Sequence, residues 1–255
     1  MSFRSIRIAV LLLIFVLIAA LTYWESWSVV QWKRPLGIVI YPIPGENSEA
    51  VERYTADLTV RHFQEIAPFI AEQSARYRLQ PVPQPVIVLG AVVHELPPTG
   101  ARGAHSALDN LLLSLKLRYY AFRNAPFWEN IGRIRLFVVY HQAEDGVALE
   151  HSLGLKKGLF GVVHAFASPK QTAQNNVVIT HELLHTLGAS DKYNADLMPI
   201  YPYGFAEPGD SVPNYPQRYA EIMAGRIAIS PTLAKIPPSL AHCVIGYKTA
   251  SEINW

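Results

Sequence analysis

The chain has 255 residues, of which 50% are hydrophobic and 16% charged, and its formal net charge is +2. This balance excludes a disordered chain, because disordered segments are poor in apolar residues, and the length suffices for one sizeable core. No basic block indicates a nucleic-acid partner, and the single Cys243 excludes both an internal disulfide and the cysteine-rich zinc modules.

The N-terminal segment predicts a membrane helix. Residues from Ile8 to Trp24 carry no charge, and at 1.5 Å per residue they span about 26 Å, close to the thickness of a bilayer core. Basic residues precede the run, and large aromatic residues lie at its end and after it, as at a membrane interface. These flanking residues are Arg4, Arg7, Tyr23, Trp24, Trp27 and Trp32.

The lack of a cleavage site decides between an anchor and a cleaved signal peptide. Cleavage requires small residues at positions −1 and −3, but Leu17 and Ile18 stand two positions before Ala19 and Ala20. We therefore expect residues 1–32 to form an uncleaved, single-pass anchor with its juxtamembrane segment. Residues 33–255 then form one domain outside the cytoplasm.

The next segments alternate between strand and helix patterns. Strands are predicted at 36–43, 85–93, 134–141 and 158–168, because these short runs are rich in β-branched residues. Helices are predicted at 49–79, broken at Pro68, and at 106–123, where Ser106 begins a capping-box-like start after a loop at 100–103. This order predicts an α/β fold with a twisted, mostly parallel sheet and flanking helices.

The stretch from Thr180 to Asp191 predicts a metal site. His181 and His185 are four residues apart, so on a helix over 174–187 both imidazoles face the same point, with Glu182 beside them. Gly188 can end that helix in a left-handed conformation, and a turn there can carry Asp191 back to the same metal. Two His, one Asp and one open position form the ligand set of a catalytic Zn²⁺.

The roles of these residues can be separated. His181, His185 and Asp191 are expected to hold the zinc, whereas Glu182 is expected to be the general base that takes a proton from the attacking water. His164 is a further candidate ligand, although a His within a strand is more often a hydrogen-bonded core residue.

Two alternative interpretations remain open. Glu207 or Glu221 could replace Asp191 as the third ligand, as in thermolysin-like hydrolases. The chain could also be a tethered binding or scaffold protein with a structural or vestigial zinc site. The intact Glu182 argues against the second alternative, since a purely structural site needs no base.

The pattern HExxHxxGxxD over 181–191 resembles the Asp variant of the metzincin zinc-peptidase signature, which snapalysin-type bacterial secreted proteases carry. Residues 221–225, with Met223, are similar to the metzincin Met-turn. The resemblance implies a peptidase acting on a peptide or protein substrate, with strand 158–168 as the sheet edge that pairs with that substrate.

The resemblance also implies a smaller C-terminal subdomain after the metal helix. Here we expect an irregular loop over 195–219 and a closing helix over 238–246. The chain departs from two family patterns: Gly225 stands where astacin-like members have a metal-side Tyr, and the absence of a Cys before the motif excludes a cysteine switch.

Overall fold

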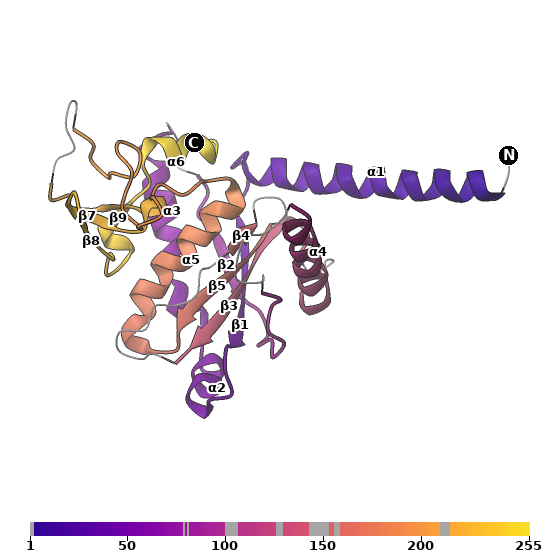
Figure 1. Ribbon diagram of the computed structural model, residues 1–255, viewed down its shortest axis with the longest axis horizontal. Coiled ribbons are helices and arrows are strands. Elements are labelled where there is room, and N and C mark those ends of the chain that lie inside the picture. The colour runs from indigo at the N-terminus through magenta and orange to yellow at the C-terminus, as the bar shows by residue number, and fades with distance from the viewer. Residues whose placement is uncertain are drawn as a thin grey trace.

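The computed structural model describes residues 3–78, 80, 82–99, 107–125, 130–142, 153–155, 159–209 and 215–255. The predicted loop at 100–103 and the Ser106 start lie outside these residues. Helix α1, Phe3–Val29, contains the predicted membrane segment and projects from the rest of the chain (Figure 1). Within the described residues, no helix combines the length and apolar character needed to cross a membrane.

A five-stranded sheet forms the centre of the fold, in the order β2-β1-β3-β5-β4. Strands β1, β2, β3 and β5 are parallel, whereas β4 runs antiparallel to β5. The predicted α/β fold with a mostly parallel sheet is confirmed. The bounds of the strands are Gly37–Pro44 (β1), Val86–Leu89 (β2), Arg133–His141 (β3), Leu153–Leu155 (β4) and Phe160–Phe166 (β5).

The expected position of strand 158–168 is wrong. That strand is β5, and it lies between β3 and β4, so β4 forms this edge of the sheet. The sequence concealed the edge because β4 has only three residues, too few to produce a recognisable alternating pattern.

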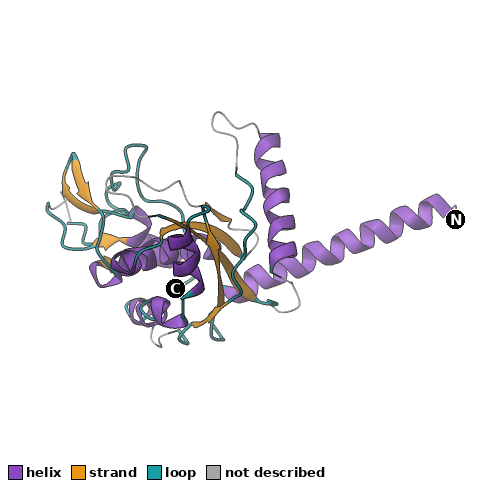
Figure 2. Ribbon diagram, turned by 90° about the horizontal axis from the view of Figure 1, so that it is seen from below, coloured by secondary structure: helices purple, strands orange, loops and turns teal. Residues whose placement is uncertain are grey.

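Helices cover both faces of the sheet (Figure 2). In β3, Leu136 and Val138 enter the core shared with α5, whereas Phe137 and Val139 enter the core shared with α4. Because alternate residues of a strand point to opposite faces, α4 and α5 lie on opposite sides of the sheet. The helices are α2 Glu49–Ala56, α3 Ile66–Ser74, α4 Ala107–Asn124 and α5 Thr172–Leu187.

The predicted helix over 49–79 is divided before Pro68. Helix α2 ends at Ala56, and the short 3₁₀ helix η1, Val60–Phe63, separates it from α3. Pro68 lies within the first turn of α3, where the N–H that proline lacks would have no partner within the helix.

After α5 the chain forms small elements instead of another large layer. The predicted helix over 238–246 is wrong: this segment contains the 3₁₀ helix η5 and strand β9, which pairs with β6, and helix α6 begins only after Gly246. The bounds are β6 Ala220–Glu221, η4 Ile222–Ala224, β7 Ile227–Ser230, β8 Leu233–Lys235, η5 Leu240–His242, β9 Cys243–Val244 and α6 Tyr247–Glu252.

Candidate metal centre

Helix α5 brings the two histidines of the motif together. Its apolar residues Ile179, Leu183 and Leu184 are fully buried against the sheet, which fixes the rotation of the helix about its axis. The Nε2 atoms of His181 and His185 are then 3.1 Å apart. The predicted i, i+4 arrangement on one face of a helix is confirmed.

The turn at Gly188 brings Asp191 to the histidines. Gly188 ends α5 with φ +117°, a left-handed conformation that costs glycine little, and Ala189 N donates to the carbonyl of Leu184. One carboxylate oxygen, Asp191 Oδ1, lies 3.2 Å from His181 Nε2 and 3.1 Å from His185 Nε2. The chain therefore turns back here, as the sequence predicted.

Backbone carbonyls fix the orientation of both imidazole rings. His181 Nδ1 lies 2.9 Å from the carbonyl oxygen of Ile222, and His185 Nδ1 lies 2.9 Å from that of Ala189. Because a carbonyl oxygen can only accept, each Nδ1 carries the hydrogen. In the neutral rings the lone pairs are then on the Nε2 atoms, which face each other, and this is the tautomer that can bind a metal.

The electrostatics of the cluster favour a cation. Burial by itself would lower the pKa of His181, but the hydrogen bond with Asp191 and the charge of Glu182 raise the pKa above its ordinary value. Burial would raise the pKa of Asp191, but hydrogen bonds from His181 and His185 hold this pKa far below its usual range. The carboxylates of Asp191 and Glu182 thus favour a positive charge between these side chains, either a proton or a metal ion.

Glu182 belongs to the same cluster. It is 5% exposed, and His181, Glu182 and His185 each offer a ligand atom within 4.8 Å of the others, so this group can hold a metal ion. Asp191 Oδ1 lies within 3.2 Å of both histidines, closer than that limit. Asp191 Oδ1 is therefore in direct contact with both Nε2 atoms, and a carboxylate oxygen of Glu182 lies in the same cluster.

The segment with Met223 forms a buried turn next to His181. Met223 is fully buried in η4, one residue after the Ile222 carbonyl that orients His181. The carboxylate of Glu221 stabilises this turn by accepting from the backbone N–H groups of Met223 and Ala224. Its other oxygen accepts from the N–H of Gly246 and the hydroxyl of Thr249 on α6. These four bonds engage both oxygens of Glu221 away from the histidines.

A partly buried ion pair, which the sequence analysis did not predict, fixes the segment that carries Asp191. Lys192 Nζ lies 2.8 Å from Glu252 Oε2 and 2.7 Å from the Ser190 carbonyl oxygen. Glu252 also accepts from the N–H and the hydroxyl of Ser190, at 3.0 and 2.9 Å. The residues on either side of Asp191 are therefore bound to the last residue of α6. In the sequence, a Lys beside an Asp and a Glu near the C-terminus look like ordinary surface charges.

The other residues considered from sequence occupy different places. His164 Nδ1 lies 2.8 Å from His141 Nε2, and the two rings are stacked. Glu207 is exposed, and its backbone bonds with the side chain of Gln217. Tyr193 does lie at the cluster, because its ring stacks on His181. Burial, the charge of Asp191 and a hydrogen bond with it raise the pKa of Tyr193 to about 12, so the phenol keeps its proton.

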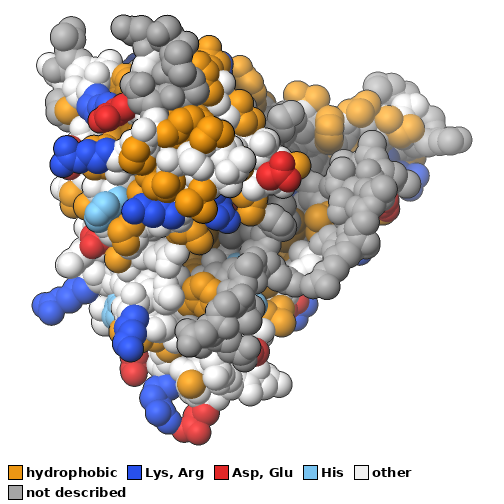
Figure 3. All heavy atoms as spheres, turned by 60° about the vertical axis from the view of Figure 1, so that its left-hand side comes forward, with side chains coloured by type: hydrophobic (Ala, Val, Ile, Leu, Met, Phe, Trp, Pro, Cys, Tyr) orange, Lys and Arg blue, Asp and Glu red, His pale blue; other side chains and the backbone are white. Residues whose placement is uncertain are grey.

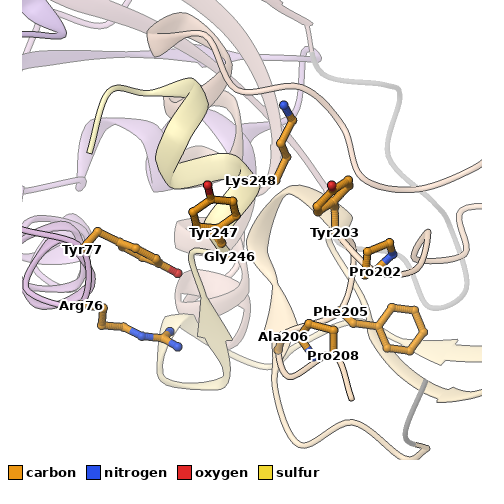
Figure 4. A pocket seen from close by; sticks show the side chains of 10 residues that line it. All are labelled: Arg76, Tyr77, Pro202, Tyr203, Phe205, Ala206, Pro208, Gly246, Tyr247 and Lys248. Carbon is orange, nitrogen blue, oxygen red and sulfur yellow. The ribbon is translucent and has the colours of Figure 1, made fainter. Parts of the chain in front are cut away.

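A separate pocket of about 290 Å³ lies among the segment after α3, the start of α6 and the loop between α5 and β6 (Figure 4). Arg76 and Tyr77 follow α3, Tyr247 and Lys248 begin α6, and the remaining side chains include Tyr203. Tyr77 donates to the Ile245 carbonyl, which joins α3 to the base of α6. The residues that line this pocket do not include those of the metal cluster.

Comparison of the chain with protein-family models and with curated proteins finds no match.

Proposed function

We propose that the chain is a membrane-anchored, zinc-dependent peptidase that acts outside the cytoplasm and has the metzincin type of site. The observation that carries the proposal is the triangle of His181 Nε2, His185 Nε2 and Asp191 Oδ1, whose sides are 3.1 to 3.2 Å. Ligands about 2.0–2.1 Å from a tetrahedral zinc are about 3.3 Å apart, so the triangle matches one face of that tetrahedron. The fourth corner would be the position of the attacking water.

The side chains of the chain account for the proposed hydrolysis. Zinc held by this triangle would supply a Lewis acid and a water of lowered pKa, near 7. Glu182 accepts the proton of the attacking water and returns it to the nitrogen of the leaving group. Tyr193 stays protonated and is hydrogen-bonded to Asp191, and its hydroxyl can donate to the negative charge that develops on the carbonyl oxygen if it turns from Asp191 to the substrate. The carbonyls of Ile222 and Ala189 hold the imidazoles in place meanwhile.

Two surfaces support a polypeptide substrate. Strand β4 ends the sheet on the side of β5, and a sheet edge can bind an extended chain through backbone hydrogen bonds. The region after α5 also exposes large apolar side chains, including Ile200, Tyr203 and Leu233. Figure 3 shows hydrophobic side chains among basic ones on the side of the molecule that this region forms.

Helix α1 is the proposed anchor. Its large apolar side chains are exposed along most of its length, from Phe3 to Trp27. Such an apolar surface is unfavourable in water and is stabilised in a bilayer. The interface residues Trp24 and Trp27 lie near the end that joins the domain, with ring centroids 5.6 Å apart.

A metal assay combined with one conservative variant tests the enzymatic proposal. The purified chain should contain one zinc per molecule and cleave an unstructured protein such as casein, and a chelator should abolish that cleavage. Glu182→Gln preserves size but cannot accept a proton, so kcat should fall about 10²- to 10⁴-fold while zinc content is unchanged. Zinc-loaded wild-type protein without any cleavage would favour the scaffold alternative. Equal cleavage by both proteins would refute Glu182 as the base.

A further inference from the structure

The outward face of α4 carries an exposed apolar stripe. Its residues follow a 3-4-3 spacing, which places them on one side of the helix, within about 80° of its circumference. They are 46% to 66% exposed. The α4 stripe consists of Leu112, Leu115, Tyr119 and Phe122. The opposite side of α4, with Leu117, Tyr120 and Ala121, packs on the sheet.

Basic side chains border the α4 stripe on both sides. At about 100° per residue, Lys116 and Arg123 follow one border of the stripe and Arg118 follows the other. All three are exposed, and Arg123 also pairs with Glu95 at 3.6 Å. Asp109 is the single acidic residue within α4, in its first turn. An apolar stripe between basic borders is typical of a helix that lies in the interface of a membrane with anionic headgroups.

The position of α4 relative to α1 points to the same partner. In both ribbon views α4 lies on the side of the domain from which α1 projects, and it runs across the direction of α1 (Figures 1 and 2). A bilayer crossed by α1 would therefore extend roughly parallel to α4. Trp24 precedes the end of α1 by five residues, or about 8 Å, which places the aromatic residues of α1 close to the domain.

We propose that the α4 stripe lies on the surface of the bilayer that α1 enters, and that this surface contains anionic lipid. The inference rests on the membrane anchor of the proposed function and deepens it. Because the sheet separates α4 from α5, contact of α4 with the bilayer directs the metal centre away from the membrane. The substrates of this site are then soluble polypeptides that arrive from the aqueous phase, not segments within the bilayer.

Quenching by lipid tests the contact in the full-length chain. The native thiol of Cys243 is buried and its pKa is raised to about 12, so a fluorophore can be attached selectively to Leu115→Cys. The matched control is Glu52→Cys, an exposed position on α2, whose Val51 belongs to the core on the α5 side of the sheet. Both proteins are reconstituted in phosphatidylcholine vesicles that contain nitroxide-labelled lipid, with or without phosphatidylglycerol.

The inference predicts strong quenching at position 115, enhanced by phosphatidylglycerol, and none at position 52. The double substitution Lys116→Gln and Arg118→Gln should weaken the binding of α4 to the anionic surface by on the order of tenfold. The reason is that each basic residue near such a surface contributes to binding. Equal quenching at both positions would overturn the inference. The inference would also be overturned if the labelled protein shows no quenching and the unlabelled Leu115→Cys protein forms disulfide-linked dimers. The stripe would then bind a second copy of the chain.

Alkaline extraction separates this inference from the proposals on which it depends. A chain that stays in the membrane pellet but shows no quenching at position 115 refutes the α4 contact and leaves the anchor intact. A chain released into the supernatant refutes the anchor and the α4 contact together. Neither result depends on peptidase activity, which the Glu182→Gln comparison tests independently.

Discussion

Glu252→Gln tests whether α6 positions the proposed third ligand. The substitution preserves the shape of the side chain but removes the charge opposite Lys192, whose side chain is only 6% exposed. Loss of one partner from a fully buried ion pair costs about 3–5 kcal/mol. The cost is smaller here because the Glu252 side chain is 18% exposed and the amide oxygen of Gln can still accept one hydrogen bond. We therefore expect a loss of about 2–3 kcal/mol in the free energy of unfolding, or about 5–10 °C in Tm.

The same substitution should weaken metal binding. Ser190 and Lys192 are bound to Glu252 on either side of Asp191, so the Asp191 carboxylate loses part of its fixed position. Substitution of a residue that orients a metal ligand typically lowers metal affinity about 10- to 100-fold. Competition with a zinc chelator at pH 7 should reveal a loss of at least about tenfold, measured well below Tm so that the protein stays folded.

The control is Glu49→Gln, which removes the partner of Arg53 in an exposed ion pair on α2. It should change stability by less than about 0.5 kcal/mol and leave zinc affinity unaltered. If Glu252→Gln lowers Tm but binds zinc as tightly as the wild type, Glu252 only stabilises the fold. The positioning role would then be wrong.

The effect of Glu252→Gln should depend on pH. Burial would raise the pKa of Glu252, but hydrogen bonds from Lys192 and Ser190 lower it below 4.5 in the folded chain. A carboxylate with a lowered folded pKa stabilises the protein above its unfolded pKa, and this contribution is lost as the pH falls through the folded value. The difference in unfolding free energy between wild type and variant should therefore be full at pH 7 and shrink below about pH 4.5.

Three further substitutions test the metal centre. Asp191→Ala should strongly reduce zinc occupancy in metal analysis; unchanged occupancy, together with metal loss in Glu207→Ala, would transfer the third ligand to Glu207. Met223→Leu is close in volume, so it should cost less than about 1.5 kcal/mol in chemical denaturation and retain zinc; loss of zinc from a folded variant would refute a packing role. Gly188→Ala places a Cβ at φ +117° and should cost about 1–2 kcal/mol and weaken zinc binding; wild-type stability and affinity would show that the turn does not need glycine.

The sequence predicted the parts of the fold that depend on local patterns. The strands at 36–43 and 134–141 are long apolar runs, and the helix up to Gly188 carries both a pattern and a stop signal. Strand β4 and the hairpin of β7 and β8 were missed because they have three or four residues each. In so short a run, pairing with a neighbouring strand decides the conformation, and intrinsic preference contributes little.

The candidate site shows the same division. The spacing of His181, Glu182 and His185 determines their common face, because 3.6 residues per turn is a local property of the helix. The prediction that Gly188 ends the helix also needed only local backbone chemistry. Gly188 has φ +117°, a conformation that glycine adopts more easily than other residues. The sequence favoured Asp191 as the carboxylate near both histidines, but it did not exclude Glu207 or Glu221.

By itself, then, the sequence determined that a helix carries His181, Glu182 and His185, where that helix ends and which side chains share its polar face. Tertiary structure decided that the Ile222 carbonyl orients His181, that Glu252 fixes the segment around Asp191, and that α4 leaves an apolar stripe exposed. The first two features join segments far apart in the chain, by 41 residues for His181 and Ile222 and by 60 for Lys192 and Glu252. Such contacts depend on how the elements pack together, and no local pattern of residues encodes that packing.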